Sequence, residues 1–172
     1  MILDVGCGDN KQGDLGVDVR KLKGVDVVCD VQHLPFKDDC FSVVKSSVVI
    51  EHVLQPFLFL KEQVRVLKPQ GTLICEADNA KYWRFQIDFS PFEADFVHHF
   101  KSDNYDASSE HLRIYYPECV ERLFKKAGLD NIITRHKSPA KKLDRAIASL
   151  FPMAWKNLCT RFIVRGKKAD VR

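Results

Sequence analysis

Runs of β-branched and other apolar residues recur along the first half of the chain and predict buried strands. The runs are nearly continuous and do not alternate with polar residues, which is typical of strands covered on both faces in a parallel sheet. They span residues 1–5, 15–19, 25–29, 41–49 and 72–76.

Two other segments carry the spacing of an amphipathic helix. In the first, an apolar residue recurs every three or four positions, at Phe57, Leu60, Val64 and Leu67. This pattern stops at 68–71, where Pro69 and Gly71 cannot continue a helix. The second helix begins at Pro117, a residue suited to a first turn, and is followed by Gly128, which is favourable just after a helix.

The rest of the chain predicts two more strands, at 131–135 and 159–165, and a helix over 144–150. Alternating strands and helices imply one α/β domain over residues 1–172, built on a parallel sheet whose ligands bind at the carboxyl ends of the strands. Residues 79–116 follow no clean period and are rich in aromatic residues and histidines. We therefore expect that segment to be an insertion or cap on the substrate side of the domain.

The net charge of +4 over 172 residues conceals an uneven distribution. Residues 134–172 hold 11 Lys/Arg and 2 Asp/Glu, a balance of +9, whereas residues 1–133 hold 16 and 21, a balance of −5. Such a run of basic residues is most often a solvated face, but a basic C-terminal quarter also permits contact with an anionic partner or a membrane surface. The six cysteines form no CxxC pair, the apolar runs are too short to span a bilayer, and the start shows no secretory signal, so we expect a cytoplasmic protein.

A glycine loop follows the first strand, in the sequence LDVGCGDN at 3–10. A dinucleotide fingerprint would need a third glycine where Lys11 stands, and a P-loop would need lysine where Asp14 stands. Asp4, Asp9 and Asp14 would also repel a phosphate. The loop therefore predicts a ligand that is neutral or cationic near the glycines.

Acidic residues end the next two predicted strands. Asp18 is placed to accept both hydroxyl hydrogens of a ribose. Asp30 could accept from an exocyclic amino group, with apolar neighbours against a purine. The fourth strand leads into Glu51 and His52, which could form the first turn of the following helix or could take part in catalysis.

These motifs together resemble the class I S-adenosylmethionine-dependent methyltransferases, and specifically the methyltransferase type 11 group. The resemblance rests on LDVGCGD at 3–9, GVDV at 16–19, CDVQHLPF at 29–36, FSVVKSSVVIEHV at 41–53, RVLKPQGTLICE at 65–76 and HLRIYYPECVERLFKKAGL at 111–129. It implies a Rossmann-like three-layer α/β sandwich with a mostly parallel seven-stranded sheet and an antiparallel last strand. It also implies S-adenosyl-L-methionine as the cofactor.

The resemblance implies a role for each matching residue. Asp4, Gly6, Cys7 and Gly8 would hold the methionine end of the cofactor. Asp18 would bind the ribose and Val19 would lie against the adenine, whose edge and face would contact Asp30, Val31 and Leu34. Ser46 and Ser47 would line the pocket beside the sulfonium.

The chain departs from the family pattern in its glycine loop. Asn10 stands where the family often has a third glycine, and only nine residues separate Gly8 from Asp18, too few for the usual helix. Lys11 and Gly13 match a subset of the family that has a short loop. Cofactor affinity is the property that this loop puts in question.

The sequence predicts methyl transfer to a small-molecule or lipid- or sugar-linked acceptor; the alternative is a non-catalytic cofactor-binding subunit that needs a partner chain. Nucleic acid ranks lower, because SSVV replaces the NPPY-type loop after the fourth strand. His52, His99 and His111 are candidate general bases. The histidines around 98–111 also have acidic neighbours, but their irregular spacing leads us to predict no metal site.

Overall fold

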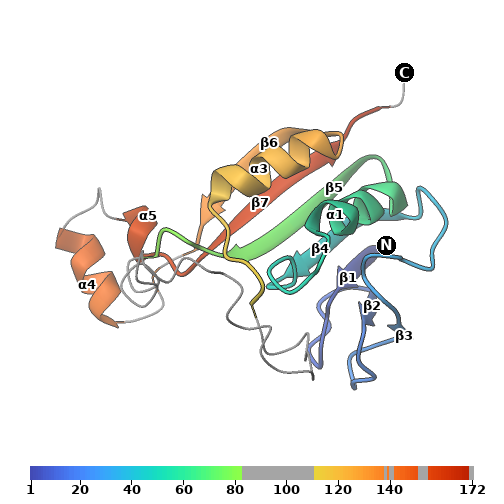
Figure 1. Ribbon diagram of the computed structural model, residues 1–172, viewed down its shortest axis with the longest axis horizontal. Coiled ribbons are helices and arrows are strands. Elements are labelled where there is room, and N and C mark those ends of the chain that lie inside the picture. The colour runs from blue at the N-terminus through green and yellow to red at the C-terminus, as the bar shows by residue number, and fades with distance from the viewer. Residues whose placement is uncertain (83–110, 138, 140–141, 151–154, 171–172) are drawn as a thin grey trace.

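A seven-stranded sheet in the order β3-β2-β1-β4-β5-β7-β6 forms the centre of the computed structural model (Figure 1). The structure describes residues 1–82, 111–137, 139, 142–150 and 155–170. The strands are β1 (Ile2–Val5), β2 (Leu15–Asp18), β3 (Val27–Val28), β4 (Phe41–Ser47), β5 (Leu67–Asp78), β6 (Leu129–His136) and β7 (Arg161–Lys168). The first five run parallel, and β7 is antiparallel to both β5 and β6. The predicted fold class, including the antiparallel last strand, is confirmed.

The middle of the sheet is the driest part of the core. Leu3 on β1 pairs with Leu15 on β2 and with Val44 on β4. Leu3 and Val44 are completely buried, as are Val5 and Val17. β1 and β2 are buried at successive positions, which agrees with their unbroken apolar runs, whereas β4 alternates between buried and more exposed positions.

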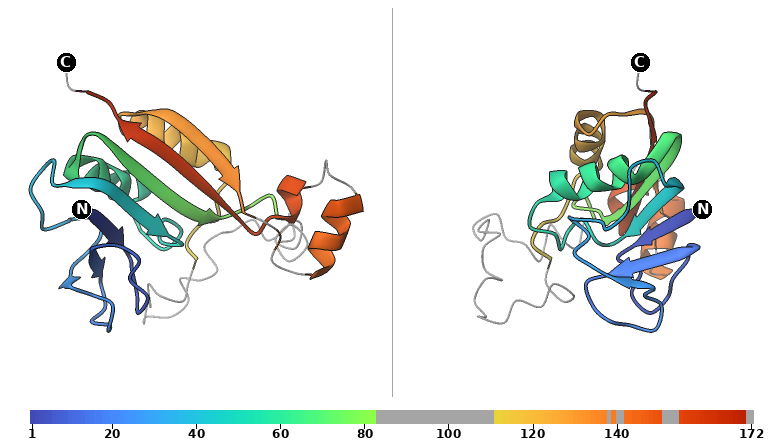
Figure 2. Two further views of the ribbon diagram at one scale, coloured as in Figure 1. Left: turned by 180° about the vertical axis from the view of Figure 1, so that it is seen from behind. Right: turned by 90° about the vertical axis from the view of Figure 1, so that its right-hand side faces the viewer.

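Two helices pack on the same face of the sheet and contact each other (Figure 2). They are α1 (Pro56–Val66) and α3 (Pro117–Lys126). Each begins with proline, whose fixed φ suits a first turn. Gly128, just beyond α3, has φ +90°, a left-handed conformation that favours glycine. Two shorter helices, α4 (Lys142–Leu150) and α5 (Trp155–Leu158), lie together at one end of the molecule.

The largest boundary difference from the sequence prediction lies at the start of β5. The predicted break at 68–71 does end α1, but β5 begins immediately, with Leu67 paired to Phe41 of β4. The pairing then shifts register and resumes at Val43 and Thr72, and Gln70 in between has φ +60°. The proline and glycine therefore form an irregular start of the strand and not a separate loop.

No helix separates β1 from β2, as the short spacing predicts. Hydrogen bonds through backbone and carboxylate groups join the loop to β1. Asp14 N–H donates to the Ile2 carbonyl at 2.9 Å, and Ile2 N–H donates to the Asp14 carboxylate at 2.7 Å. Gln12 N–H donates to the Asp4 carboxylate at 2.6 Å. These hydrogen bonds to β1 hold the loop in place where other members of such folds have a helix.

The predicted cap at 79–116 lies mostly outside the described residues, which resume at His111, and so stays a prediction. Its two ends do meet: Asn79 forms a β-bridge with Tyr115, and Ala80 N–H donates to the Tyr115 carbonyl at 3.0 Å. None of the helices within the described residues is long and apolar enough to cross a membrane.

Candidate functional site

A cleft of about 310 Å³ opens at the carboxyl ends of the first four strands. Its volume is within the range of about 300–1,000 Å³ that is usual for small-molecule sites. The lining residues are Gly6, Asp18, Val19, Arg20, Asp30, Val31, Gln32, Val48, Val49, His52, Val53 and Leu54. Five of the predicted cofactor residues are in this set, and they come from three separate loops.

The glycine loop forms one side of the cleft. Gly6 has φ +69° and Gly8 has φ +56°, so both use backbone conformations that other residues rarely adopt. A Cβ on Gly6 would lie 2.4 Å from Cγ2 of Val49 on the opposite wall. The Gly8 N–H donates to the Asp18 carboxylate at 3.1 Å. The loop therefore approaches both the acidic residue and the apolar wall closely.

Asp18 is buried at the end of β2, and Arg20, which lines the cleft, donates hydrogen bonds to it. One carboxylate oxygen accepts from the Arg20 backbone N–H at 3.0 Å and from its Nε at 3.1 Å. Burial alone would raise the pKa of Asp18, but the hydrogen bonds from Arg20 and Gly8 together hold it below its usual value. Asp18 is therefore an ionised acceptor at neutral pH, as ribose binding requires.

Asp30 and Val31 form a second edge of the cleft, beyond β3. The Asp30 side chain is half exposed, and it accepts from the Gln32 backbone N–H at 2.9 Å. Burial would raise its pKa, but the hydrogen bonds from Gln32 and His33 prevail and lower it. Val31 is mostly buried beside it. An exposed acceptor next to an apolar surface suits the edge and face of a purine.

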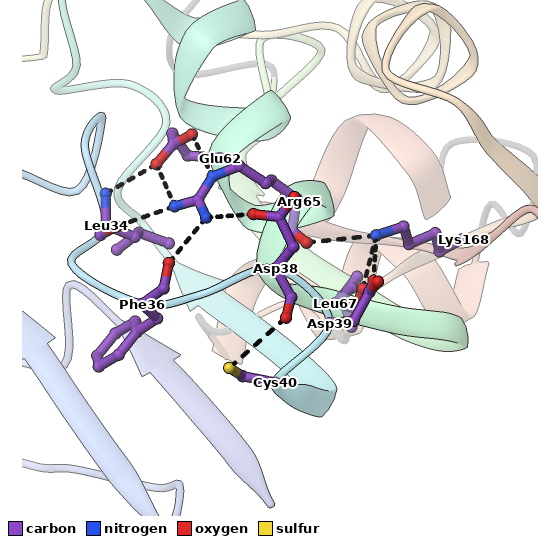
Figure 3. Close-up of polar contacts among 9 residues, drawn as sticks. All are labelled: Leu34, Phe36, Asp38, Asp39, Cys40, Glu62, Arg65, Leu67 and Lys168. Carbon is purple, nitrogen blue, oxygen red and sulfur yellow. Dashed lines mark hydrogen bonds and ion pairs between the residues drawn. The ribbon is translucent and has the colours of Figure 1, made fainter. Parts of the chain in front are cut away.

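Arg65 of α1 anchors the loop that carries these residues (Figure 3). Its guanidinium donates to the carbonyls of Leu34 and Phe36 at 2.9 and 2.7 Å, and to the Asp38 and Glu62 carboxylates. Glu62 in turn accepts from the Leu34 N–H at 2.9 Å. The planar guanidinium suits this multiple contact because its donors point in fixed directions. The RVLKPQG motif thus supports the purine side of the cleft from behind.

Several predicted residues lie outside the lining. Leu34 is 4% exposed and packs in the core, and Ser46 is 2% exposed within β4. Ser47 is exposed, and the Cys7 thiol donates to the Gly24 carbonyl. Asp4 is buried, which raises its pKa, and it accepts from the glycine loop. Gly8 reaches Asp18 through its backbone without lining the cleft. The roles expected of these six residues stay predictions.

The far wall of the cleft follows β4. Val48 has φ +56°, a strained conformation for a β-branched residue, and its N–H donates to the Glu76 carbonyl at 2.9 Å. His52 N–H donates to the Val49 carbonyl, which closes a tight turn well before α1 begins at Pro56. Glu51 and His52 are therefore not the first turn of that helix. The turn presents His52 to the cleft.

His52 contacts a second candidate histidine. The rings of His52 and His111 lie edge to face, with centroids 4.8 Å apart. His111 Nε2 is 3.7 Å from a carboxylate oxygen of Asp78, whose other oxygen accepts from Arg161 Nε at 3.0 Å. The third candidate, His99, lies outside the described residues. Two of the three predicted bases are thus brought together, and His52 is the one that reaches the cleft.

Glu51 is 1% exposed and packs beneath the surface next to His52. Its carboxylate accepts from the Asp78 N–H at 3.1 Å, and its backbone carbonyl accepts from Leu112 at 2.8 Å. Burial raises the pKa of Glu51 to about 7. The same residue therefore links the turn after β4, the end of β5 and the segment that carries His111.

Sequence reasoning missed Arg20, Gln32, Val48, Val49, Val53 and Leu54 in the lining. Arg20 could have been found, since it stands two residues after the predicted ribose acceptor. The apolar residues carried no signal, because a valine in the core and a valine facing a ligand look alike in sequence.

The cleft fits the predicted cofactor in its donor set. Two carboxylates, Asp18 and Asp30, line it and can accept from hydroxyl and amino groups, whereas their negative charge would repel a phosphate. Val19, Val31 and Leu54 supply the apolar surface that an adenine ring needs. A Rossmann-like sheet with an acidic and apolar cleft at its carboxyl edge is the arrangement found in a class of nucleoside-binding proteins.

Comparison with known proteins agrees with this class. Residues 9–75 match the family model of the methyltransferase domain. A demethylmenaquinone methyltransferase of Clavibacter sepedonicus is 42% identical over 75 residues, which cover 41% of this chain and 31% of the relative. A protein of Mycolicibacterium smegmatis named "probable S-adenosylmethionine-dependent methyltransferase" is 29% identical over 158 residues, covering 78% and 59%. The chain thus spans less than two thirds of either relative.

The fold agrees as well. The crystal structure of an S-adenosylmethionine-dependent methyltransferase from Thermotoga maritima superimposes with a TM-score of 0.69 at 18% identity, covering 97% of this chain and 81% of that one. The matched domain and the shared fold agree with the predicted family, the type 11 group of the class I S-adenosylmethionine-dependent methyltransferases. The same matches agree with S-adenosyl-L-methionine as the predicted cofactor.

Proposed function

We propose that this chain transfers a methyl group from S-adenosyl-L-methionine to a small-molecule or lipid- or sugar-linked acceptor. The observation that carries the proposal is the pair of carboxylates, Asp18 and Asp30, on one apolar cleft at the carboxyl edge of the sheet. The Clavibacter relative is named as a demethylmenaquinone methyltransferase, which supports a small-molecule acceptor over a nucleic acid.

The bound cofactor supplies an electrophilic methyl group on a sulfonium. The chain's own residues hold it in place: Asp18 accepts from the ribose hydroxyls, and Asp30 accepts from the amino group of the base. The valines of the wall exclude water and fix the acceptor's approach. Alignment of two reactants in a fixed geometry can supply most of the acceleration of such a displacement.

The experiment that tests cofactor binding is calorimetric titration with S-adenosylmethionine and S-adenosylhomocysteine. We expect Asp18→Asn to weaken both by about tenfold to a hundredfold, because a charged acceptor contributes about 1.5–3 kcal/mol to its hydrogen bonds. Asp14→Asn is the matched control, since Asp14 stands just before the opposite end of β2, outside the cleft lining. Wild-type protein that binds neither compound at about millimolar concentration would refute the proposal.

We assign proton acceptance to His52, for acceptors that lose a proton, because it is the described histidine that lines the cleft. His52→Gln keeps a polar side chain but cannot take up the proton. We expect it to lower turnover by about a hundredfold with such an acceptor and to leave the affinity for S-adenosylhomocysteine unchanged. Turnover at the wild-type rate would remove His52 from this role.

A further inference from the structure

The two short helices α4 and α5 form a projecting unit at one end of the molecule (Figures 1 and 2). They pack on each other beyond the carboxyl end of β5. Asn79, the residue after β5, is completely buried and donates through Nδ2 to the carbonyls of Lys156 and Cys159 at 2.9 and 2.8 Å. The unit is therefore fixed to the same edge of the sheet on which the cleft opens.

The charge exposed on this unit is of one sign. Arg145 on α4 and Lys156 on α5 are exposed, and neither forms an ion pair with a described residue. The one acidic residue of α4, Asp144, is completely buried and accepts from the Tyr82 hydroxyl at 2.8 Å. It faces the protein and so does little to offset the basic side chains at the surface.

Large apolar side chains are exposed beside these charges. Leu150, at the end of α4, is 73% exposed, and Trp155, at the start of α5, is 39% exposed. The opposite side of α4 buries Asp144 and Ala148, one turn apart. A surface with an exposed leucine and tryptophan among lysine and arginine is typical of segments that lie in the interface of a bilayer. Tryptophan suits that interface because its ring is apolar and its N–H is polar.

The rest of the chain makes this contact directional. Of the basic residues in 134–172, Lys137, Arg161 and Lys168 pair with Glu76, Asp78 and Asp39 on the body of the protein. Arg145 and Lys156 on the two helices pair with no described acid, so an anionic surface attracts the helices and is repelled by residues 1–133, whose net charge is −5. A nucleic acid could bind the basic side chains through its phosphates, but it would leave the aliphatic side chain of Leu150 exposed to water. An anionic lipid surface accounts for both kinds of residue.

We propose that α4 and α5 dock this protein on an anionic membrane surface through Arg145, Leu150, Trp155 and Lys156. Docking there turns the carboxyl edge of the sheet toward the lipid. The inference about the acceptor rests on the proposed methyl transfer: if that holds, the acceptor is a molecule carried in or on the membrane.

The test is sedimentation of the full chain with vesicles of phosphatidylcholine alone, and with vesicles in which about a third of that lipid is phosphatidylglycerol. We expect binding to the anionic vesicles only, weakened by salt. Arg145→Glu with Lys156→Glu should weaken the partition at least about tenfold, and Leu150→Ser with Trp155→Ser should weaken it as well. The matched control is Arg122→Glu with Lys125→Glu on α3, an equal change of charge on exposed residues, which should retain more of the binding.

Equal binding to both vesicle types, or equal loss in the α3 control, would overturn the proposal. So would tight binding of a single-stranded RNA that is unaffected by the Leu150 and Trp155 substitutions, because the partner would then be nucleic acid. Titration of every variant with S-adenosylhomocysteine separates the two proposals. Cofactor binding without vesicle binding rejects docking alone, and vesicle binding without cofactor binding rejects methyl transfer alone.

Discussion

Replacing Gly6 by alanine should lower the free energy of unfolding by about 2–4 kcal/mol and narrow the cleft. Two costs add at this position. The backbone has φ +69°, where a residue with a Cβ is strained by about 1–2 kcal/mol. The new Cβ would also lie 2.4 Å from Cγ2 of Val49, so the valine must shift into the cleft that it lines. Urea denaturation measures the first effect, and titration with S-adenosylhomocysteine measures the second.

Gly8→Ala is the matched control, because Gly8 has φ +56° but a Cβ added there would meet no described atom within 4 Å. It should incur only the backbone cost, about 1–2 kcal/mol. Adding Val49→Ala to Gly6→Ala should recover the steric part, with a coupling of about 1–2 kcal/mol between the two sites. If Gly6→Ala and Gly8→Ala destabilise the protein equally and Gly6→Ala shows no coupling to Val49→Ala, the contact between position 6 and Val49 contributes nothing to the free energy of unfolding.

The order of strands and helices was predictable because each burial pattern leaves a local period. The unbroken apolar runs mark β1 and β4 as central strands, and Pro117 and Gly128 mark the ends of α3 within a residue or two. The strand β3 is only two residues long in the structure, Val27–Val28, although its apolar run is longer. An apolar run shows that a segment is buried but does not show how many of its residues find a partner strand.

The acidic residues of the site were predictable from the sequence, because acids at strand ends are uncommon. Its apolar residues were not, because apolar residues are common throughout the core. Asp18 and Asp30 stand at strand ends, where an acid has few structural uses, and both line the cleft. Leu34 was expected against the adenine, yet its N–H is held by Glu62 and its side chain packs in the core. Arg65 supports that loop through contacts 27–31 residues away in sequence, which no local pattern encodes.

Glu51 shows the same limit, because its environment is built by distant segments. Its carboxylate is bound by the Asp78 N–H from the next strand, and its second oxygen is buried with no hydrogen-bond partner among the described residues. In sequence it looks like an ordinary polar residue before a helix. The pKa of Glu51 is raised only because β4, β5 and the 111–113 segment pack around it in the folded protein.

Glu51 should therefore lower the free energy of unfolding by up to about 3 kcal/mol as pH rises from about 4.5 to about 7. Burial raises its pKa in the folded protein to about 7, above the ordinary value of 4.5, so the folded state holds the proton more tightly than the unfolded state. The stabilisation is complete below the unfolded pKa and is lost as pH passes the folded one. Urea denaturation at about pH 5 and about pH 8 measures the difference.

Glu51→Gln should abolish this contribution, because glutamine keeps an acceptor for the Asp78 N–H and cannot ionise. The comparison uses the difference between the two pH values within each protein, so any constant cost of burying the amide cancels. Glu118→Gln makes the same chemical change on an exposed side chain whose pKa is lowered, chiefly by its hydrogen bond from Lys81. It should leave the fall in stability in place. A Glu51→Gln protein that loses as much stability between the two pH values as the wild type would show that Glu51 is already ionised in the fold.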